Sequence, residues 1–361
     1  MSGGERETEN GTMQGWIEPL GLLHGETARA AVSAGQALWL RGGPLAFTLV
    51  RVGGQGREAR IVPASLIPAD ETPMLQALTQ PLPPFAGLAA GAPGRPLVMG
   101  ILNVTPDSFS DGGRYGTEAA AVAAGEAMLA AGADMLDLGA ESTRPGAEPV
   151  DPETECARLL PVLRHLAPAA CVSVDTRNAR TMRAALDAGA TVVNDISALR
   201  HDPAALGTVA ASGCSAVLMH MPGTDPRTMQ ALAQYGDVVP EVAAFLHARI
   251  LACEAAGIPR HRIAVDPGLG FGKTLAHNLE LLDRLPLLHG LGCAVLLGAS
   301  RKGFIGRASG EPVAARRLGG SLAAALAGAA RGAAILRVHD VAETVQALAL
   351  ARAVAEGAPP P

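Results

Sequence analysis

From residue 97 onward, short apolar runs alternate with longer stretches rich in Ala, Leu, Glu and Arg. The apolar runs are nearly uninterrupted, which is typical of strands buried on both faces. We predict strands over residues 97–103, 134–139, 171–175, 191–196, 216–221, 262–267, 293–299 and 333–338. Helical segments are predicted between these strands, for example over residues 117–132, 153–167, 178–189, 237–257 and 315–331, and a last helix over residues 341–355.

This alternation predicts the fold class. Eight strand–helix units in about 260 residues match the size and count of an α/β protein of the (β/α)8 TIM-barrel type. A doubly wound open sheet is the alternative. The Gly-rich turn that usually follows the first strand of such a sheet is absent, and Asn-Val-Thr-Pro-Asp stands in its place.

The region before residue 97 has a different pattern. Residues 1–12 are polar, and we expect a disordered tail there. Residues 13–70 form a small N-terminal extension of α/β character, with a helix-like stretch around Glu26–Ala34 and strand-like runs at Leu38–Leu40, Ala46–Val52 and Ala59–Val62. Residues 71–96 are rich in Pro and Gly and are interpreted as a linker, so the barrel is assigned to residues 97–356. No catalytic group is recognised before residue 97, and the role of the extension stays open.

Polar side chains stand at nearly every predicted strand end. The first strand stops at Asn103 and opens into a loop that reads Val-Thr-Pro-Asp-Ser-Phe-Ser-Asp-Gly-Gly. The later strands contain, end in or run into Asp137, Asp175, Asn194-Asp195, His220, Asp266, Ser300-Arg301-Lys302 and Arg337-Val338-His339. Each one alone could be a helix cap or a satisfied buried group. All eight strand ends of a barrel meet at one mouth, so together these residues predict a binding site there.

The residue types suit a ligand with two kinds of surface. Asp175, Asn194 and Asp266 offer carboxylate and amide groups that match a flat heterocycle with several N–H donors. Cationic or potentially cationic groups suit a phosphate-rich leaving group; they are Arg144, Arg301, Lys302, Arg337 and His339. The alternative for the basic residues is ion pairing with Asp175 and Asp266 inside the mouth.

Residues 266–274 look like a phosphate-binding P-loop. That pattern requires Gly five positions before Gly272, where this chain has Pro267. Proline has no N–H to offer a phosphate. We therefore interpret the segment as a glycine-permitted loop that passes close to a ligand, with Asp266 as the working group. An NTPase is disfavoured.

The composition and net charge of the chain mainly exclude certain classes of protein. Hydrophobic residues make up 48% of the 361 residues and charged residues 17%, which is typical of a compact folded protein. A net charge of -5 gives no electrostatic argument for nucleic acid or an anionic membrane as partner. The first residues lack the apolar core of a signal peptide, and no apolar run approaches the length of a membrane-spanning helix. The 5 cysteines lack metal-binding spacing and are interpreted as free thiols of a cytoplasmic protein.

Taken together, the motifs at the strand ends resemble those of dihydropteroate synthase, a folate-pathway family inhibited by sulfonamides. The resemblance covers roughly residues 97–350 and rests on Met99–Gly113, Glu141–Gly146, Val172–Thr176, Asn194–Ile196, Leu218–Met221, Asp266–Lys273, Gly298–Lys302 and Arg337–Asp340. It implies a TIM barrel that is usually a homodimer. It also implies a transferase that condenses p-aminobenzoate with dihydropterin pyrophosphate, giving dihydropteroate and pyrophosphate.

Carried over residue by residue, the resemblance implies three subsites. The pterin subsite would use Thr143, Asp175, Asn194, Met219, Asp266, Phe271 and Lys302. The pyrophosphate subsite would use Asn103, Arg144, Arg337 and His339, with Asn103 also beside Mg²⁺. The p-aminobenzoate subsite would use Phe109, Pro145, Arg301 and Lys302. The catalytic group would be Asp175, Asp266, Lys302, Arg337 and His339.

This chain departs from the family pattern in two places. Gly303 follows the Ser-Arg-Lys motif where some members have Ser, so a hydroxyl contact near p-aminobenzoate is in doubt. Residues 1–95 have no counterpart in the short members of the family.

Two other functions share some of these features. A methyltransferase barrel that passes a folate methyl group to a corrinoid would share the pterin-recognising Asp and Asn. It would need neither the anion-binding residues nor the first-loop motif, and both are present here. A non-catalytic pterin-binding paralogue is opposed only by the completeness of the expected residues.

Overall fold

The computed structural model describes residues 13–357 except residue 14 and residues 55–56, 68–72, 90–94, 105–112 and 142–149. The predicted tail at 1–12 lies outside the described residues. Within them, parallel strands close into a barrel in the order β10-β11-β12-β5-β6-β7-β8-β9. The strands are β5 (Leu97–Asn103), β6 (Met135–Gly139), β7 (Cys171–Asp175), β8 (Val192–Asp195), β9 (Ser215–Met219), β10 (Ile263–Asp266), β11 (Ala294–Leu297) and β12 (Ile335–Val338). The TIM-barrel prediction is confirmed, and the doubly wound sheet is excluded.

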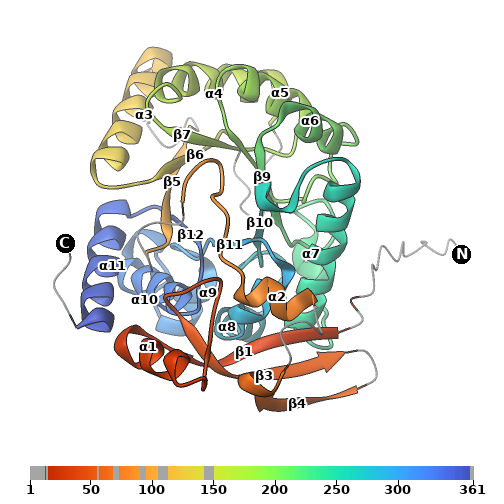
Figure 1. Cartoon of the computed structure of the whole chain (residues 1–361). Coiled ribbons are helices and arrows are strands. Elements are labelled where there is room, and N and C mark those ends of the chain that lie inside the picture. The colour runs from red at the N-terminus through yellow and green to blue at the C-terminus, as the bar shows by residue number, and fades with distance from the viewer. Residues whose placement is uncertain are drawn as a thin grey trace, which may run out of the picture.

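Helices surround the barrel (Figure 1). They are α3 (Gly113–Ala130), α4 (Pro152–Leu166), α5 (Ala179–Asp187), α6 (Ala205–Ser212), α7 (Val238–Ala255), α8 (Leu275–Asp283), α9 (Gly303–Ser309), α10 (Leu318–Ala329) and α11 (Val341–Glu356). Short 3-10 turns lie at η3 (Met229–Leu232), η4 (Arg260–Arg262), η5 (Leu285–Leu291) and η6 (Ala314–Arg316). The prediction of helices between the strands is confirmed, although the sequence analysis gave no bounds for α6, α8 and α9, which are among the shorter helices. None of the helices in the described ranges is long and apolar enough to span a bilayer.

Local sequence explains where the helices begin. At the start of α4, the Asp151 side chain accepts hydrogen bonds from the backbone N–H groups of Glu153 (3.1 Å) and Thr154 (2.9 Å). Pro152 occupies the first turn, where its missing N–H costs nothing. At α8, Thr274 and His277 cap each other's backbone N–H groups. These signals fix helix ends from a few residues of sequence.

Alternation along the strands sorts the side chains into layers. Residues on one face of each strand, such as Leu136 and Val172, pack against the helices in the main core. Residues on the other face point into the barrel. Its lower layer is apolar and includes Met99, Met135 and Val217, together with the buried ring of Phe85 from the segment before β5. The polar residues lie above this layer, at the carboxyl ends of the strands.

The N-terminal extension is a small antiparallel sheet with two helices. Its elements are β1 (Gly15–Leu23), α1 (Gly25–Ser33), β2 (Leu38–Trp39), β3 (Ala46–Gly54), β4 (Arg57–Pro63), η1 (Ala64–Leu66) and α2 (Pro73–Thr79). The sequence did not predict β1, because Pro19 and Gly21 interrupt its strand pattern. It pairs with β3 from Gly15↔Gly54 to Leu23↔Ala46.

Helix α2 corrects part of the linker prediction for residues 71–96. Its Leu75 and Leu78 are fully buried with Ile17 and Phe47 in the core of the extension. The Pro and Gly residues around this helix led to the linker prediction. Pro73 is compatible with the helix because it stands in the first turn, where proline is tolerated.

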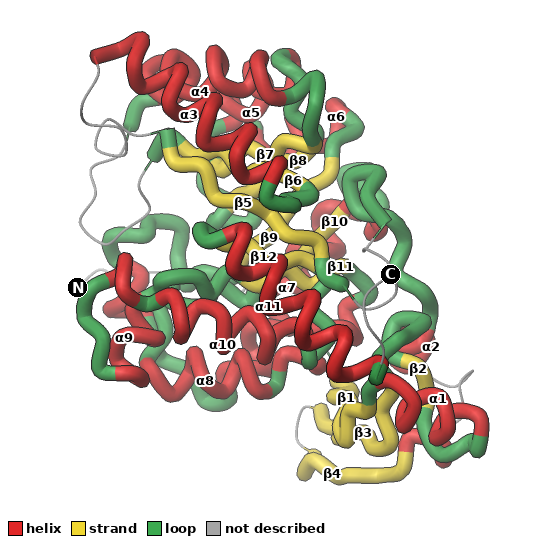
Figure 2. Tube along the Cα trace, turned by 90° about the vertical axis from the view of Figure 1, so that its left-hand side faces the viewer, coloured by secondary structure: helices red, strands yellow, loops and turns green. Residues whose placement is uncertain are grey.

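The extension packs against the end of the barrel opposite the mouth (Figure 2). A Cβ on Gly25 would lie 1.9 Å from the backbone oxygen of Ala355, so α1 touches the end of α11 at a point that only glycine permits. Glu18 is buried and accepts hydrogen bonds from Arg51 (2.9 Å) and Arg284 (3.2 Å). These contacts place the extension away from the strand ends that carry the predicted site.

Candidate active site

One row of side chains crosses four neighbouring strands at the mouth. Asn103 on β5 is the register partner of Gly139 on β6, which pairs with Asp175 on β7, which pairs with Asn194 on β8. A Cβ on Gly139 would meet Asn103 Oδ1 at 3.7 Å and Asp175 Oδ2 at 3.8 Å. The glycine therefore leaves space between an amide and a carboxylate that lie close together. The predicted convergence of these residues is confirmed.

Arg337 on β12 reaches across the barrel to this row. Its Nε donates to Asp137 Oδ2 (2.5 Å) and its Nη2 donates to Asp175 Oδ2 (2.7 Å). Asn194 Nδ2 donates to the same Asp137 oxygen (3.0 Å). The alternative of ion pairing therefore holds for Arg337. Within the described part of the chain its Nη1 makes no hydrogen bond that would compete for an incoming anion.

Burial and neighbouring charge perturb Asp175. Desolvation raises the pKa of Asp175 to about 7 against the attraction of Arg337, and the negative charge of Asp137 raises it further. Burial lowers the pKa of Arg337, but the carboxylates of Asp137 and Asp175 more than offset this and raise it above its ordinary value, so the guanidinium stays charged. An acceptor that titrates near neutral pH in a cleft is typical of a functional site.

Asp266 and Lys302 form a second charged group beside the first. Asp266 Oδ1 accepts a hydrogen bond from Gly268 N (2.7 Å), and Lys302 Nζ donates to Leu269 O (2.6 Å). Gly298 leaves room beside this pair, because a Cβ there would lie 3.5 Å from Asp266 Oδ2, 3.7 Å from Lys302 Nζ and 3.9 Å from Arg337 Cβ. Burial raises the pKa of Asp266 and lowers that of Lys302 to about 8, and their mutual attraction opposes both shifts.

The glycines after β10 allow the chain to turn closely over the mouth. Gly268, Gly270 and Gly272 have φ of 68°, 84° and 59°, and a Cβ on Gly268 would lie 2.0 Å from His220 O. Lys273 is buried and its Nζ bonds to His220 Nδ1 (3.0 Å) and Phe271 O (2.9 Å). The lysine of the P-loop-like motif therefore braces the loop, as expected for a segment that is no P-loop.

An apolar wall stands beside the charged groups. Met219 and Phe271, both predicted to line the pterin subsite, pack in one cluster with Ile196, Met221 and Met229. The Lys302 ammonium lies 4.8 Å from the centre of the Phe271 ring, a cation–π contact. A flat ring can thus meet an apolar surface and polar acceptors at the same mouth.

Two predicted basic residues have partners of their own. Arg301, in a left-handed conformation with φ of 59°, makes a two-pronged ion pair with Asp340 through Nε (3.0 Å) and Nη2. This partner was not foreseen. His339 Nδ1 lies 3.0 Å from Ser300 Oγ, which also accepts from the His339 backbone N–H (3.2 Å). Phe109, Thr143, Arg144 and Pro145 lie outside the described residues.

Sequence reasoning did not assign Asp137 to a subsite. It is fully buried, and its Oδ1 has no hydrogen-bond partner within the described residues. The sequence did contain a signal for this role. Asp137 is a carboxylate two positions before the end of an otherwise apolar strand, so it lies on the same strand face as Gly139. Asp137 therefore lies deeper in the barrel and holds Arg337 and Asn194 in place by accepting their hydrogen bonds.

Comparison with known proteins agrees with this geometry. A family model described as "Pterin binding enzyme" matches residues 99–339. The dihydropteroate synthase of Neisseria meningitidis serogroup C is 49% identical over 258 residues, which cover 70% of this chain and 91% of the relative. The Escherichia coli K12 dihydropteroate synthase is 45% identical over 260 residues, covering 72% and 91%.

Solved structures give the same result. Xanthomonas albilineans dihydropteroate synthase with 4-aminobenzoic acid superposes with a TM-score of 0.68 at 52% identity, over 72% of this chain and 93% of that one. The Yersinia pestis dihydropteroate synthase with a sulfonamide drug gives 0.68 at 44% identity, over 72% and 94%. These structures cover 72% of this chain and so leave about 28% of it uncovered, close to the share that residues 1–96 make up.

Proposed function

The chain belongs to the dihydropteroate synthase family, and we propose that its barrel mouth condenses p-aminobenzoate with dihydropterin pyrophosphate, giving dihydropteroate and pyrophosphate. The observation that carries this function is the row Asn103, Gly139, Asp175 and Asn194 with Arg337 bonded across it. In the reaction, the bond between the pterin methylene and pyrophosphate oxygen breaks, and the amine nitrogen bonds to that methylene. The amine loses a proton in the same process.

The pterin ring is recognised by acceptors set deep in the mouth. Asp175 and Asp266 would accept hydrogen bonds from ring N–H groups, and Asn194 would supply an amide beside them. The anionic carboxylates also favour positive charge on the ring and methylene as the bond to pyrophosphate breaks. Met219 and Phe271 would cover the apolar face of the ring. A ring lacking the matching donors would leave buried acceptors unpaired, which gives this subsite its selectivity.

Cationic side chains stabilise the leaving group. Arg337 lies on β12, His339 directly after it, and Lys302 after β11. All three would interact with pyrophosphate as charge accumulates on it. Removing one preorganised donor of this kind typically costs about 3 kcal/mol of transition-state stabilisation. Arg144 would add to them from the segment after β6.

The donor set at the mouth fits a magnesium ion held mainly by the substrate. The described residues contain no cluster of three or more His, Cys, Asp or Glu side chains that would form a dedicated metal cage. Asn103 Oδ1 is a hard oxygen ligand next to Asp175. Mg²⁺ prefers oxygen ligands and usually takes one or two from protein and others from phosphates and water. Asn103 would hold the ion, which when bound neutralises pyrophosphate charge.

The p-aminobenzoate subsite is assigned to Phe109, Pro145, Arg301 and Lys302. Phe109 and Pro145 would close over p-aminobenzoate and exclude water that competes with the amine. We also propose a homodimer, which sedimentation velocity can test. The free cysteines of the described chain suit a cytoplasmic location.

The test is pyrophosphate release from the full chain. With dihydropterin pyrophosphate, p-aminobenzoate and magnesium, the protein should release pyrophosphate and form dihydropteroate in equal amounts. Folded protein that binds the pterin but releases no pyrophosphate would indicate the non-catalytic paralogue. Methyl transfer from a methylated folate to a corrinoid would indicate the methyltransferase. Turnover should fall when a chelator removes magnesium and return when the ion is restored.

A further inference from the structure

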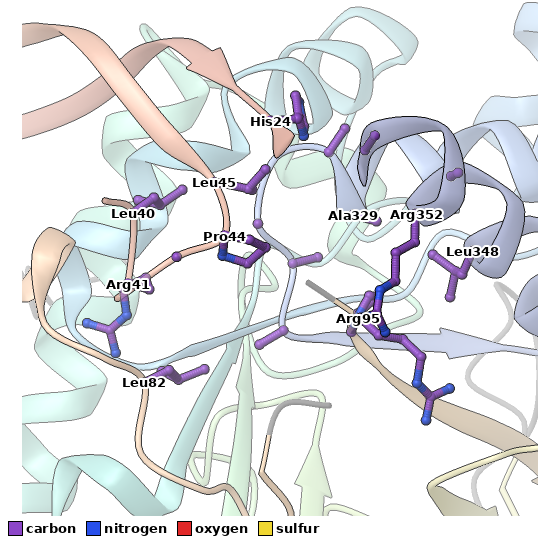
Figure 3. Close-up of a pocket in the computed structure, with 18 of the residues that line it drawn as sticks. His24, Leu40, Arg41, Pro44, Leu45, Leu82, Arg95, Ala329, Leu348 and Arg352 are labelled. Carbon is purple, nitrogen blue, oxygen red and sulfur yellow. The ribbon is translucent and has the colours of Figure 1, made fainter. Parts of the chain in front are cut away.

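A second cavity lies at the opposite end of the barrel, between the extension and the barrel (Figure 3). Its volume is about 590 Å³, within the range of small-molecule sites. The walls come from the start of α1, the segments 40–45 and 81–82, the amino ends of β11 and β12, and the ends of α10 and α11. No residue assigned to the active site lines it.

Small side chains leave this space open. The α10 and α11 walls and the turn before β12 present Ala329, Ala330, Gly332, Ala333, Ala334, Ala351 and Ala355. Facing them, Leu40, Leu45 and Leu82 supply larger apolar surface. An apolar body of moderate size could therefore bury itself here without displacing the backbone.

Arginines dominate the charge of the cavity walls. Arg29, Arg41, Arg95 and Arg352 line the cavity, against the single carboxylate of Glu356. Three of the four have acidic partners. Arg95 pairs with Asp134, Arg352 Nε lies 2.8 Å from Glu356, and Arg29 Nη2 lies 2.9 Å from Glu26.

Arg41 is the exception. In the described part of the chain it has no carboxylate partner, and its guanidinium bonds to the backbone oxygens of Ala77 and Gly292. Its buried Nε has no partner there. The residue adopts φ of 51°, an uncommon conformation for a residue with a side chain. A half-buried cation without a counter-ion gives the cavity an uncompensated positive charge.

The histidines of the walls do not add to this charge. Burial lowers the pKa of His24, and it lowers that of His289 to about 4. His289 is further tied to Arg331 O through Nε2 (2.9 Å). Both rings are therefore neutral near pH 7, and the positive charge belongs to the arginines.

We propose that this cavity binds a small anionic molecule with an apolar body, such as an aromatic carboxylate or phosphate ester. In Figure 3, Arg352 and Arg95 extend toward one side of the cavity from α11 and from the segment before β5, and Arg41 lies on the other side. Arg352 and Arg95 present guanidinium forks that suit an anionic group, and the charge of Arg41, unpaired within the described chain, makes the cavity favour an anion over a neutral molecule. The leucine and alanine surface covers the apolar body. This site is independent of the proposed catalytic function.

The test uses three matched probes on the full chain: naphthoate, naphthyl phosphate and the neutral naphthamide. Each is titrated by calorimetry with a neutral pterin and a neutral sulfonamide present at saturation, so that the mouth is occupied by uncharged molecules that do not compete for the arginines of the cavity. We expect one binding site per chain and an affinity at least about tenfold higher for an anion than for the amide, a preference of ~1.4 kcal/mol. Equal affinities, or no saturable binding of any probe, would overturn the proposal.

Variants then locate the site. Arg352→Gln should weaken binding of the anions at least fivefold and leave naphthamide unchanged, whereas Ala329→Leu should abolish binding of all three by filling the space. Matched controls are Arg180→Gln, which removes an exposed helix arginine paired with Glu153, and Ala323→Leu on the exposed face of α10. If Ala329→Leu does not fold, Arg95→Gln replaces it. Wild-type anion affinity in Arg352→Gln and in the second variant would refute the site.

Discussion

Asp175→Asn tests the central acceptor of the mouth. The substitution keeps the shape of the side chain and removes its charge. Asp175 is mostly buried, with 15% of its side chain exposed, and accepts a 2.7 Å hydrogen bond from Arg337. A hydrogen bond to a charged partner contributes about 1.5–3 kcal/mol. Loss of the charged acceptor for the pterin ring should therefore weaken pterin binding by more than about tenfold.

The pH dependence gives a second readout of the same carboxyl group. Burial raises the pKa of Asp175 to about 7, so near pH 6 the folded protein holds a proton there that the unfolded chain has released. The contribution of this group to stability is therefore complete below its ordinary pKa of 3.8 and is lost as pH rises through 7. Pterin affinity changes in the opposite sense, because the ionised form is the acceptor. It should rise between about pH 6 and about pH 8 in the wild type.

Calorimetry with dihydropterin pyrophosphate measures both effects. The Asp175→Asn protein should show weaker binding and should lose the rise in affinity across neutral pH. Asp283→Asn is the matched control, because Asp283 is an exposed partner of Arg331 far from the mouth. Unchanged pterin affinity in a folded Asp175→Asn protein would remove Asp175 from the pterin subsite. The role of Asp175 would then be limited to positioning Arg337.

Three other changes probe the support of the site. Asp137→Asn should lower stability by about 2 kcal/mol and reduce turnover, since Arg337 loses a buried charged partner; urea unfolding with unchanged midpoint would contradict this. Gly268→Ala should cost roughly 1–3 kcal/mol or more, because a Cβ would lie 2.0 Å from His220 O at a positive φ; a thermal midpoint equal to that of the wild type would refute the close approach. A chain starting at residue 80 should keep turnover. A chain starting at residue 90 also loses the buried Phe85 ring, so its free energy of unfolding should be about 3–5 kcal/mol lower. Equal stability of the two truncated chains would show that Phe85 does not support the barrel.

The sequence by itself determined the barrel, its strand positions and the polar character of its mouth. Apolar runs of strand length, alternating with helical segments, carry this information locally, because each strand needs both faces covered. The positions of Asn103, Asp175, Asn194 and Asp266 at strand ends were enough to predict that they share a cavity. The sequence also ruled out the P-loop, since Pro267 lacks the N–H that such a loop requires.

Only the tertiary structure decided which charges pair. Arg337 meets Asp137 and Asp175 across separations of 200 and 162 residues, and strand register with barrel closure sets these contacts. The sequence missed β1 and α2, whose stability comes from packing within the extension and not from local pattern. The second cavity likewise arises where alanines of α10 and α11 face leucines of the extension, and segments distant along the chain create that space only when they pack together.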